Sequence, residues 1–266
     1  MENKTLEESI ISAMELTDEA LIKYLPYIFQ DHWELGTSSE EIIEIIKKHR
    51  TNYSSLNVLD LGSGKGAISI KTASELGCNC FGIDGVNDFI TFSKNESKEY
   101  SVENICTFET NDIRTRIKTL KKFDIILVMA IGPIFGNYYD TLTELSSHVN
   151  DDGLIIIDDG YVENDCKKVY PNKEYPNVLR EKEINEQVNK AEMEIIEKIT
   201  INEISGTEVK YDTDYKNIQM RCMELVEKYP ENKELFLSYV EKQKREYEIL
   251  SNEIVPAIFV IKKKLK

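Results

Sequence analysis

The stretch Asn57-Val-Leu-Asp-Leu-Gly-Ser-Gly-Lys-Gly66 predicts a buried strand that runs directly into a glycine-rich turn. Its first half is a short apolar run of the kind that forms central parallel strands, which are covered on both faces. Residues 67–76, which follow the turn, are compatible with a helix. The turn can adopt positive φ angles and present backbone N–H groups to a ligand at the start of that helix, because three residues lack a Cβ atom: Gly62, Gly64 and Gly66.

The spacing of the glycines indicates which class of nucleotide-like ligand a turn of this kind binds. A phosphate-binding P-loop requires a serine or threonine after its Gly-Lys pair, but here Gly66 follows Lys65. A dinucleotide fingerprint has two residues before its last glycine, whereas this turn has one. Asp60 stands two positions before Gly62, where its carboxylate would repel a pyrophosphate and attract an ammonium or sulfonium group. An ordinary strand-to-helix turn without a ligand is the alternative for this motif taken alone.

The segment Asp60-Leu-Gly-Ser-Gly-Lys-Gly66 resembles the first motif of the class I S-adenosylmethionine-dependent methyltransferases, an acidic residue followed by G-x-G-x-G. The resemblance covers residues 57–161 well and the rest of the chain in outline. It implies that S-adenosylmethionine is the cofactor. The residues expected to hold its methionine moiety are Asp60, Gly62, Ser63, Gly64 and Gly66.

Asp84 follows a second predicted strand at residues 78–83. A carboxylate at the end of this strand can accept hydrogen bonds from both ribose hydroxyls of an adenosine that lies across the strand tips, and the family uses an acidic residue here in this way. We therefore place Asp84, with the adjacent Gly85, in the cofactor site. An aspartate that only caps the next helix is the alternative.

The resemblance also implies that Asp112 takes the adenine amino group and that Ile113 covers the adenine ring, just beyond a third strand. Residues 123–129 form an apolar fourth strand, with Met129 at its tip beside the cofactor. The tip continues as Ala130-Ile-Gly-Pro133 and lacks the Asn/Asp-Pro-Pro-Tyr/Phe motif that is common in methyltransferases acting on base amines or glutamine amides. Methylation of such groups is therefore disfavoured.

A fifth strand at residues 154–157 ends in Asp158-Asp-Gly-Tyr161. Since side chains alternate along a strand, Asp158 and Asp159 must diverge near the edge where the methyl group is presented. We expect Asp159 to orient the substrate or accept its proton, and Tyr161 to supply a hydroxyl or an aromatic wall. The alternative is that these residues form only a turn that leaves the sheet.

The alternation of five strands with helices up to residue 157 indicates a doubly wound parallel sheet. The right-handed crossover rule places the loops at the strand ends along one edge. We therefore expect an α/β fold with a mostly parallel seven-stranded sheet. The chain is divided into an N-terminal helical arm (1–50), a cofactor-binding core (51–161) and a segment that completes the sheet (162–266), with a helical insertion at about 214–250 over the pocket, between strands six and seven.

The ends of the chain give less definite patterns. Residues 28–39 contain Trp33, and they form either a loop that plugs the core or an arm that folds over the cofactor pocket. Residues 183–197 predict an amphipathic helix, and residues 254–261 predict an antiparallel last strand. The sixth strand is expected from the alternation of Ile199, Ile201 and Ile204.

Composition limits the functions open to this chain. The net charge of −15 over 266 residues is hostile to nucleic acid. The five cysteines form no metal-spaced cluster, so no metal site is expected, and the chain contains no apolar segment of membrane-spanning length. These features predict a cytoplasmic protein with a small-molecule substrate, and they leave the oligomeric state open.

The sequence therefore predicts transfer of a methyl group from S-adenosylmethionine to a small molecule. Two alternatives come from other classes of function. One is a partner subunit that binds S-adenosylmethionine without catalysis. The other is an NAD-dependent oxidoreductase, which the glycine spacing and Asp60 disfavour.

Overall fold

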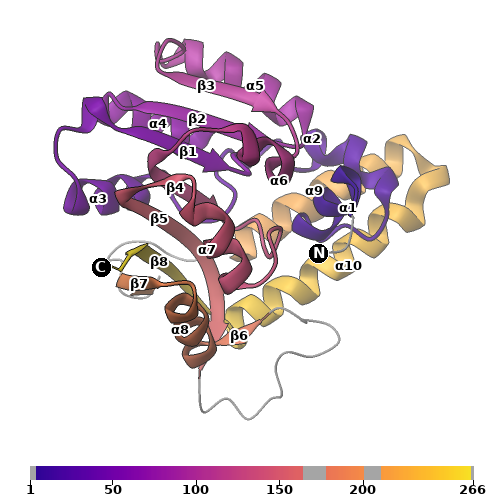
Figure 1. The fold of residues 1–266 in the computed structure, drawn as a ribbon. Helices are drawn as coiled ribbons and strands as arrows, with labels where there is room; N and C mark the ends of the chain where they lie inside the picture. The colour runs from indigo at the N-terminus through magenta and orange to yellow at the C-terminus, as the bar shows by residue number, and fades with distance from the viewer. Residues whose placement is uncertain (1–3, 164–177, 201–210, 265–266) are drawn as a thin grey trace.

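The computed structural model describes residues 4–163, 178–200 and 211–264 and contains a central β-sheet with helices on both faces (Figure 1). Its strands are β1 Asn57–Leu61, β2 Asn79–Asp84, β3 Cys106–Thr110, β4 Phe123–Met129, β5 Val149–Val162, β6 Leu179–Arg180, β7 Met193–Thr200 and β8 Val255–Lys263. They lie in the order β3-β2-β1-β4-β5-β8-β7, and β6 pairs with β5 beside this path. The pairings from β3 to β5 are parallel, whereas β8 runs antiparallel to β5 and β7. The expected α/β fold with a mostly parallel sheet is confirmed.

The α-helices of the described residues are α1 Leu6–Ala13, α2 Leu25–Ile28, α3 Ser39–His49, α4 Ala67–Leu76, α5 Asn87–Glu99, α6 Ile113–Arg116, α7 Tyr138–Ser146, α8 Glu181–Lys190, α9 Tyr211–Lys228 and α10 Lys233–Asn252. Short 3₁₀ turns are η1 Glu19–Tyr24, η2 Tyr53–Ser55, η3 Ile117–Thr119 and η5 Pro230–Asn232. No described helix combines the length and the apolar character that crossing a membrane requires.

Two apolar cores cover the two faces of the sheet. Helices α3, α4 and α5 pack on one face, and α6, α7 and α8 pack on the other. Leu154 and Ile156 of β5 belong to the first core, whereas Ile155 and Ile157 belong to the second, as the period of two in a strand predicts. This alternation directs Asp158 and Asp159, the next two residues, to opposite sides of the sheet.

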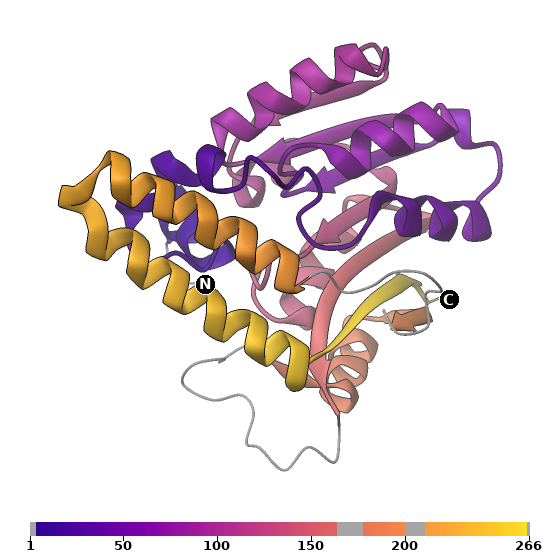
Figure 2. The same cartoon turned by 180° about the vertical axis from the view of Figure 1, so that it is seen from behind.

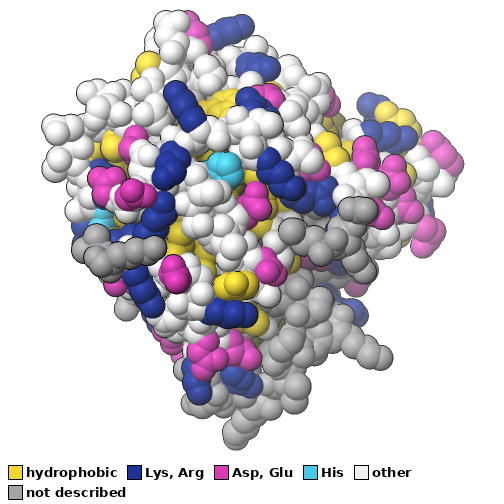
Figure 3. Space-filling model, viewed as in Figure 1, with side chains coloured by type: hydrophobic (Ala, Val, Ile, Leu, Met, Phe, Trp, Pro, Cys, Tyr) yellow, Lys and Arg dark blue, Asp and Glu magenta, His cyan; other side chains and the backbone are white. Residues whose placement is uncertain are grey.

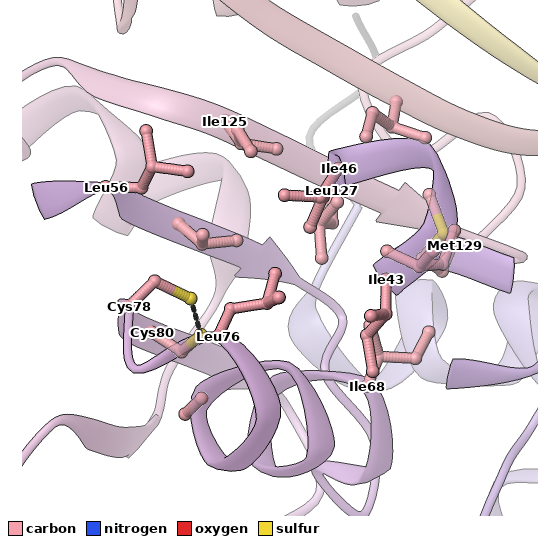
Figure 4. Packing of buried hydrophobic residues seen from close by; sticks show 14 of the residues in the cluster. Ile43, Ile46, Leu56, Ile68, Leu76, Cys78, Cys80, Ile125, Leu127 and Met129 are labelled. Carbon is pink, nitrogen blue, oxygen red and sulfur yellow. Dashed lines mark hydrogen bonds between the residues drawn. The ribbon is translucent and has the colours of Figure 1, made fainter. Parts of the chain in front are cut away.

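The first core shows how β1, β2 and β4 are held against α3 and α4 (Figure 4). Met129, at the tip of β4, lies near Ile43 and Ile68, and all three side chains are buried. Cys78 and Cys80 are buried in the same core with their sulfur atoms 3.7 Å apart. Both cysteines are free thiols.

The register of the parallel strands determines where a ligand can bind. Leu61 of β1 lies opposite Ile83 of β2 and Val128 of β4, so these three strands end at the same edge of the sheet. Helices follow β1 and β2 within a few residues, and their N-termini therefore face this edge. The site is expected here by the rule that ligands bind outside the carboxyl ends of parallel strands.

The prediction of a helix at residues 183–197 is wrong in its second half. Residues 183–197 do not form a single helix, because α8 ends at Lys190, Glu192 has a φ of 58°, and β7 begins at Met193. The apolar residues that indicated a helix are Ile184, Val188, Ala191 and Ile195, and the last step, of four residues, also fits one face of a strand. Ile199 lies in β7 as expected, whereas Ile201 and Ile204 lie outside the described residues.

Strand β5 is longer than expected. It begins at Val149, and its pairing with β4 shifts in register between Phe123 and Ile125, so residues 150–153 form an irregular part of the strand instead of a separate turn. At its other end the two-residue strand β6 adds an eighth strand to the seven that the sequence predicts.

The N-terminal segment and the C-terminal helix pair form a third core at the carboxyl edge of the sheet. Buried residues of η1 and α2 pack against α9 and α10, and Figure 2 shows this helix pair beside the N-terminal elements. Two polar contacts add to the packing, because Arg221 of α9 donates to both oxygens of Asp31 at 2.6 and 2.8 Å, and the Tyr27 hydroxyl donates to Glu224 at 2.7 Å. Helices α9 and α10 are thus an insertion between β7 and β8 that supports the arm.

Candidate functional site

A cavity that is open to solvent lies at the carboxyl ends of β1, β2 and β4. Its floor is the glycine turn after β1, and its far wall is the segment from Met129 to Ile134 after β4. Two parts of the N-terminal segment form the roof, namely α1 and the arm residues Trp33, Glu34 and Leu35. No residue of α9 or α10 lines this cavity, so the described insertion contacts the arm instead of the cavity itself.

The turn after β1 has the backbone that its glycines predict. Gly62, Gly64 and Gly66 have φ angles of 73°, 52° and 74°. A Cβ atom on Gly62 would lie 2.3 Å from Cγ2 of Ile131, so a side chain at this position would collide with the opposite wall. Gly62, Ser63 and Gly64 line the cavity, whereas Gly66 lies behind it against Phe108.

Asp84 lines the cavity at the end of β2. One of its carboxylate oxygens accepts a hydrogen bond from the backbone N–H of Gly64 and the other accepts one from Val86, both at 2.8 Å. Because each carboxylate oxygen can accept a second hydrogen bond, Asp84 can still receive ligand hydroxyls. Burial raises the pKa of Asp84, and the hydrogen bonds from Val86 and Gly64 oppose this shift.

Asp60 is more deeply buried than the sequence indicated, with 2% of its surface exposed, but it also lines the cavity. Ser69 Oγ donates a hydrogen bond to its Oδ2 at 2.6 Å. Burial raises the pKa of Asp60 to about 6. Nearby, Oγ of Ser63 is buried and has no hydrogen-bond partner among the described residues. This part of the cavity therefore offers a ligand the Asp60 carboxylate, which can accept hydrogen bonds beyond that from Ser69, and the Ser63 hydroxyl, which has no partner among the described residues.

The predicted adenine residues also line the cavity. Asp112 caps α6 by accepting from the backbone N–H of Arg114 at 2.9 Å, and the Arg114 guanidinium lowers the pKa of this aspartate. Ile113 is buried beside it. Gly85 lies under α1, since a Cβ on this glycine would be 2.9 Å from Cδ1 of Leu6. The structure thus brings the predicted cofactor residues to one cavity, apart from Gly66.

The two predicted catalytic residues do not line this cavity. Asp159 lies on the α7 side of the sheet and is exposed to solvent, and its carboxylate accepts a hydrogen bond from the Tyr138 hydroxyl at 3.0 Å. Tyr161 is buried, with its ring centroid 6.2 Å from that of Phe259. Its hydroxyl lies 3.2 Å from Nζ of Lys198. The structure therefore separates this pair from the cofactor residues.

Asp158, the other half of the acidic pair, holds the arm in place. Its Oδ2 accepts a hydrogen bond from the backbone N–H of Thr37 at 3.1 Å. Gly36 lies between the two strand tips, because a Cβ on it would be 2.9 Å from Ala130 Cβ and 3.1 Å from Asp158 Oδ2. Burial raises the pKa of Asp158 to about 6. Of residues 28–39, Trp33, Glu34 and Leu35 line the cavity, and Gly36 and Thr37 fasten the arm to the ends of β4 and β5 beside it.

Sequence reasoning missed several lining residues. Those of α1 are Leu6, Ser9 and Ile10, with Ala13 and Met14 at its end. The apolar residues of this segment recur at helical spacing. The sequence does not show what this apolar face covers, because the residues that it contacts are far away in sequence. Lys65 was also missed, although it lies within the first motif. No group of three or more His, Cys, Asp or Glu residues suitable for a metal ion is found among the described residues.

Comparisons with known proteins agree with this geometry. The sequence profile of a family described as a methyltransferase domain matches residues 52–250. Ubiquinone biosynthesis O-methyltransferases are similar in sequence: that of Rickettsia felis is 28% identical over 134 residues, and that of Rickettsia akari is 26% identical over 178 residues. These matches cover 49% and 59% of this chain, and 51% and 67% of the relatives. The chain thus spans about half the length of the first relative.

Solved structures extend the likeness to the whole fold. The S-adenosylmethionine-dependent methyltransferase from Geobacter sulfurreducens, in complex with S-adenosylhomocysteine, has a TM-score of 0.74 at 16% identity. The alignment covers 91% of this chain and 98% of that one. The corresponding protein from Thiobacillus denitrificans has a TM-score of 0.72 at 17% identity, covering 90% and 97%. The chain therefore belongs to the methyltransferase domain family, the S-adenosylmethionine-dependent methyltransferases with the Rossmann-like class I fold.

Proposed function

We propose that this protein transfers a methyl group from S-adenosylmethionine to a small molecule that enters beside the segment from Met129 to Ile134. The observation that supports this proposal is that the two halves of the cavity are lined by different kinds of residue, acidic and polar in one half and apolar in the other. Asp60, Ser63, Asp84 and Asp112 line one half, and Met129, Ala130, Ile131 and Ile134 line the other. The acidic half suits a cationic adenosine cofactor, and the apolar half suits a small acceptor.

The residues of this chain fit the cofactor in their chemistry. Asp84 has free acceptor capacity for ribose hydroxyls, Asp112 and Ile113 would hold the adenine, and Asp60 and Ser63 Oγ would hold the methionine moiety. The bound cofactor supplies an electrophilic methyl group. The chain supplies position, because the glycine turn and the wall around Ile131 would fix one reactant and the roof of α1 and Trp33 covers part of the cavity. Positioning alone can provide much of the rate gain in such a reaction.

A small acceptor is supported by the shape and the charge of the site. The roof covers the cavity with the side chains of α1 and the arm. Described Lys and Arg side chains share the face shown in Figure 3 with Asp and Glu side chains, and the net charge of −15 disfavours a nucleic-acid backbone as partner. The relatives from Rickettsia are named as O-methyltransferases, so hydroxyl-bearing acceptors, including phenols, are the first to test.

Calorimetry and a transfer assay together test the function. We expect S-adenosylhomocysteine and S-adenosylmethionine to bind and NAD not to bind. With methyl-labelled cofactor, label should appear in an acceptor from a panel of small phenols and other hydroxyl compounds. Binding without transfer to any class of acceptor would favour the partner-subunit alternative, and binding of NAD would favour an oxidoreductase.

Roles for Asp159 and Tyr161 in turnover of the acceptor are proposed from their place in the last part of β5, next to Asp158, which contacts the arm. Asp159 is exposed in the last part of β5, and its carboxylate accepts a hydrogen bond from the Tyr138 hydroxyl. Asp159→Asn and Tyr161→Phe should leave the affinity for S-adenosylhomocysteine within about twofold, because neither residue lines the cavity. Each should lower the turnover or raise the KM of the acceptor. Tyr138→Phe, which removes only the hydroxyl that bonds Asp159, is the matched control. Turnover equal to that of the parent in both variants would make the two residues structural.

The pH dependence of cofactor binding should reveal the ionisation of Asp60. Burial raises the pKa of this carboxyl to about 6, and only its ionised form attracts a cationic ligand. Binding then releases a proton below that pH, so the affinity for S-adenosylmethionine should rise with pH up to about 6 and level off above it. Below 6 it should fall by up to about tenfold per pH unit. Calorimetry from pH 5 to 7.5 measures this, and Asp60→Asn should reduce the dependence. An unchanged profile in that variant would assign the titration to another group.

A further inference from the structure

Helix α1 presents a half-buried apolar face to the cavity. Leu6, Ile10 and Met14 share this face at a spacing of four, and all three line the cavity. Leu6 and Ile10 lie over Gly85, because a Cβ atom on that glycine would be 2.9 Å from Cδ1 of Leu6 and 3.2 Å from Cδ1 of Ile10. A ligand bound at the neighbouring Asp84 would cover more of this apolar face, and that burial would hold α1 in place.

Arg114 of α6 joins the start of α1 to Asp112. Its guanidinium donates to both carboxylate oxygens of Asp112, from Nη2 at 2.6 Å and from Nε at 3.0 Å. Nη2 also donates to the backbone carbonyl of Thr5, the N-cap of α1, at 3.1 Å. Asp112 and, after it, Glu8 in the first turn of α1 raise the pKa of Arg114. One planar guanidinium thus contacts both the predicted adenine residue and the first residue of the roof.

Helix α10 holds the other end of α1 (Figure 1). Tyr239 donates a hydrogen bond to the carbonyl of Met14 at 3.3 Å, and Lys242 forms an ion pair with Glu15 at 2.8 Å. The chain turns at this point, since Glu15 has a φ of 51°. Helix α1 is therefore attached at both ends, by the insertion at the turn and by Arg114 at the start. Of these two attachments, the one at Arg114 is shared with a predicted cofactor residue.

We propose that Arg114 is a positioning residue that couples cofactor binding to the closure of α1. Its guanidinium orients the Asp112 carboxylate toward the adenine and, through the Thr5 carbonyl, holds α1 closed over the ribose. Release of the cofactor then requires the contact between Arg114 and Thr5 to break, so that α1 opens about the turn at Met14 and Glu15. The proposal rests on the proposed function, because it takes the adenine to lie at Asp112. An ion pair that only shapes the start of α6 is the competing explanation.

The release rates of two ligands that differ only at the purine separate these explanations. S-adenosylhomocysteine has the amino group that Asp112 would accept, and S-inosylhomocysteine has a carbonyl oxygen in its place. Stopped-flow fluorescence of Trp33, the only tryptophan and a lining residue, is the measurement. Arg114→Met should speed the release of both ligands by about 3- to 10-fold, the range for one net hydrogen bond, because α1 covers the ribose in either case. Leu6→Ala should also speed both, and the double variant should be no faster than the faster single variant, since both changes open α1.

Arg116→Met is the matched control, because Arg116 lies on the same short helix, pairs with Glu109 and does not line the cavity. It should keep the parental release rates. Faster release of S-adenosylhomocysteine alone in Arg114→Met would mean that Arg114 acts on Asp112 only, and the coupling would be wrong. Effects of Arg114→Met and Leu6→Ala that multiply would contradict it too. If Arg114→Met does not fold, Leu6→Ala still decides, since unchanged release of both ligands would overturn the closure of α1. These rates need no methyl acceptor, so failure to find one bears on the proposed function alone.

Discussion

Replacing Asp84 by alanine is expected to weaken the binding of S-adenosylhomocysteine by about 10- to 150-fold, which corresponds to about 1.5–3 kcal/mol for hydrogen bonds to a charged acceptor. Asp84 lines the cavity at the end of β2, and both of its oxygens retain acceptor capacity beyond the bonds from Gly64 and Val86. Alanine would remove the acceptor for the ribose hydroxyls and would also release the N–H of Gly64. Loss of the ligand contact and loosening of the turn therefore act in the same direction.

Two further variants separate the parts of this effect. Asp84→Asn keeps the shape of the side chain but turns one acceptor oxygen into an N–H donor, which would oppose one of the two backbone donors. Asp88→Ala removes a carboxylate of the same size from the first turn of the neighbouring helix α5 and should leave the affinity within about twofold, because Asp88 does not line the cavity. Affinity by isothermal titration is the measurement. Unchanged binding in Asp84→Ala would remove Asp84 from the cofactor site.

The sequence predicted those parts of the fold that local pattern determines. The run before Gly62 is apolar on both faces and becomes β1, and the two-residue alternation from Leu154 to Ile157 divides between the two cores. The prediction was wrong where one pattern fits two kinds of secondary structure. Residues 191 and 195, for example, are four positions apart, a spacing that fits both a helix and a strand. The length of β5 could not be predicted either, because a register shift opposite Phe123 depends on the neighbouring strand.

The sequence predicted the site residues that lie near the carboxyl ends of the strands. It did not predict the site residues that come from segments far away in sequence. Asp60 is the residue before the last of β1, Asp84 ends β2 and Asp112 follows β3, and the parallel register brings them to one cavity. The roof depends on α1 and Trp33, which contact the turn from far away in sequence. Asp159 was predicted at a strand tip, but β5 continues to Val162, Asp159 pairs with Ala257 of β8, and its side chain points to α7.

Gly66→Ala should reduce the free energy of unfolding by about 2–5 kcal/mol, the sum of a left-handed backbone penalty of about 1–2 kcal/mol and an overpacking cost of about 1–3 kcal/mol. Gly66 has a φ of 74°. A Cβ on it would lie 2.7 Å from Cζ of Phe108 and 2.9 Å from Cβ of Ser93. The Phe108 ring cannot simply move away toward Gly82, since a Cβ at Gly82 would lie 2.6 Å from the same ring. The ring fits between two residues that lack side chains.

Gly132→Ala separates the two contributions, because Gly132 has a similar φ of 64° and a Cβ there would meet nothing within 4 Å. It should show the backbone penalty alone, about 1–2 kcal/mol. Urea denaturation of the parent and both variants, with equal m-values, gives the two differences. The cost at Gly66 should exceed that at Gly132 by at least about 1 kcal/mol if the close packing of Phe108 and Ser93 is rigid. Equal costs would mean that this packing relaxes around a methyl group, and glycine at this position of the turn would then be required by the backbone conformation alone.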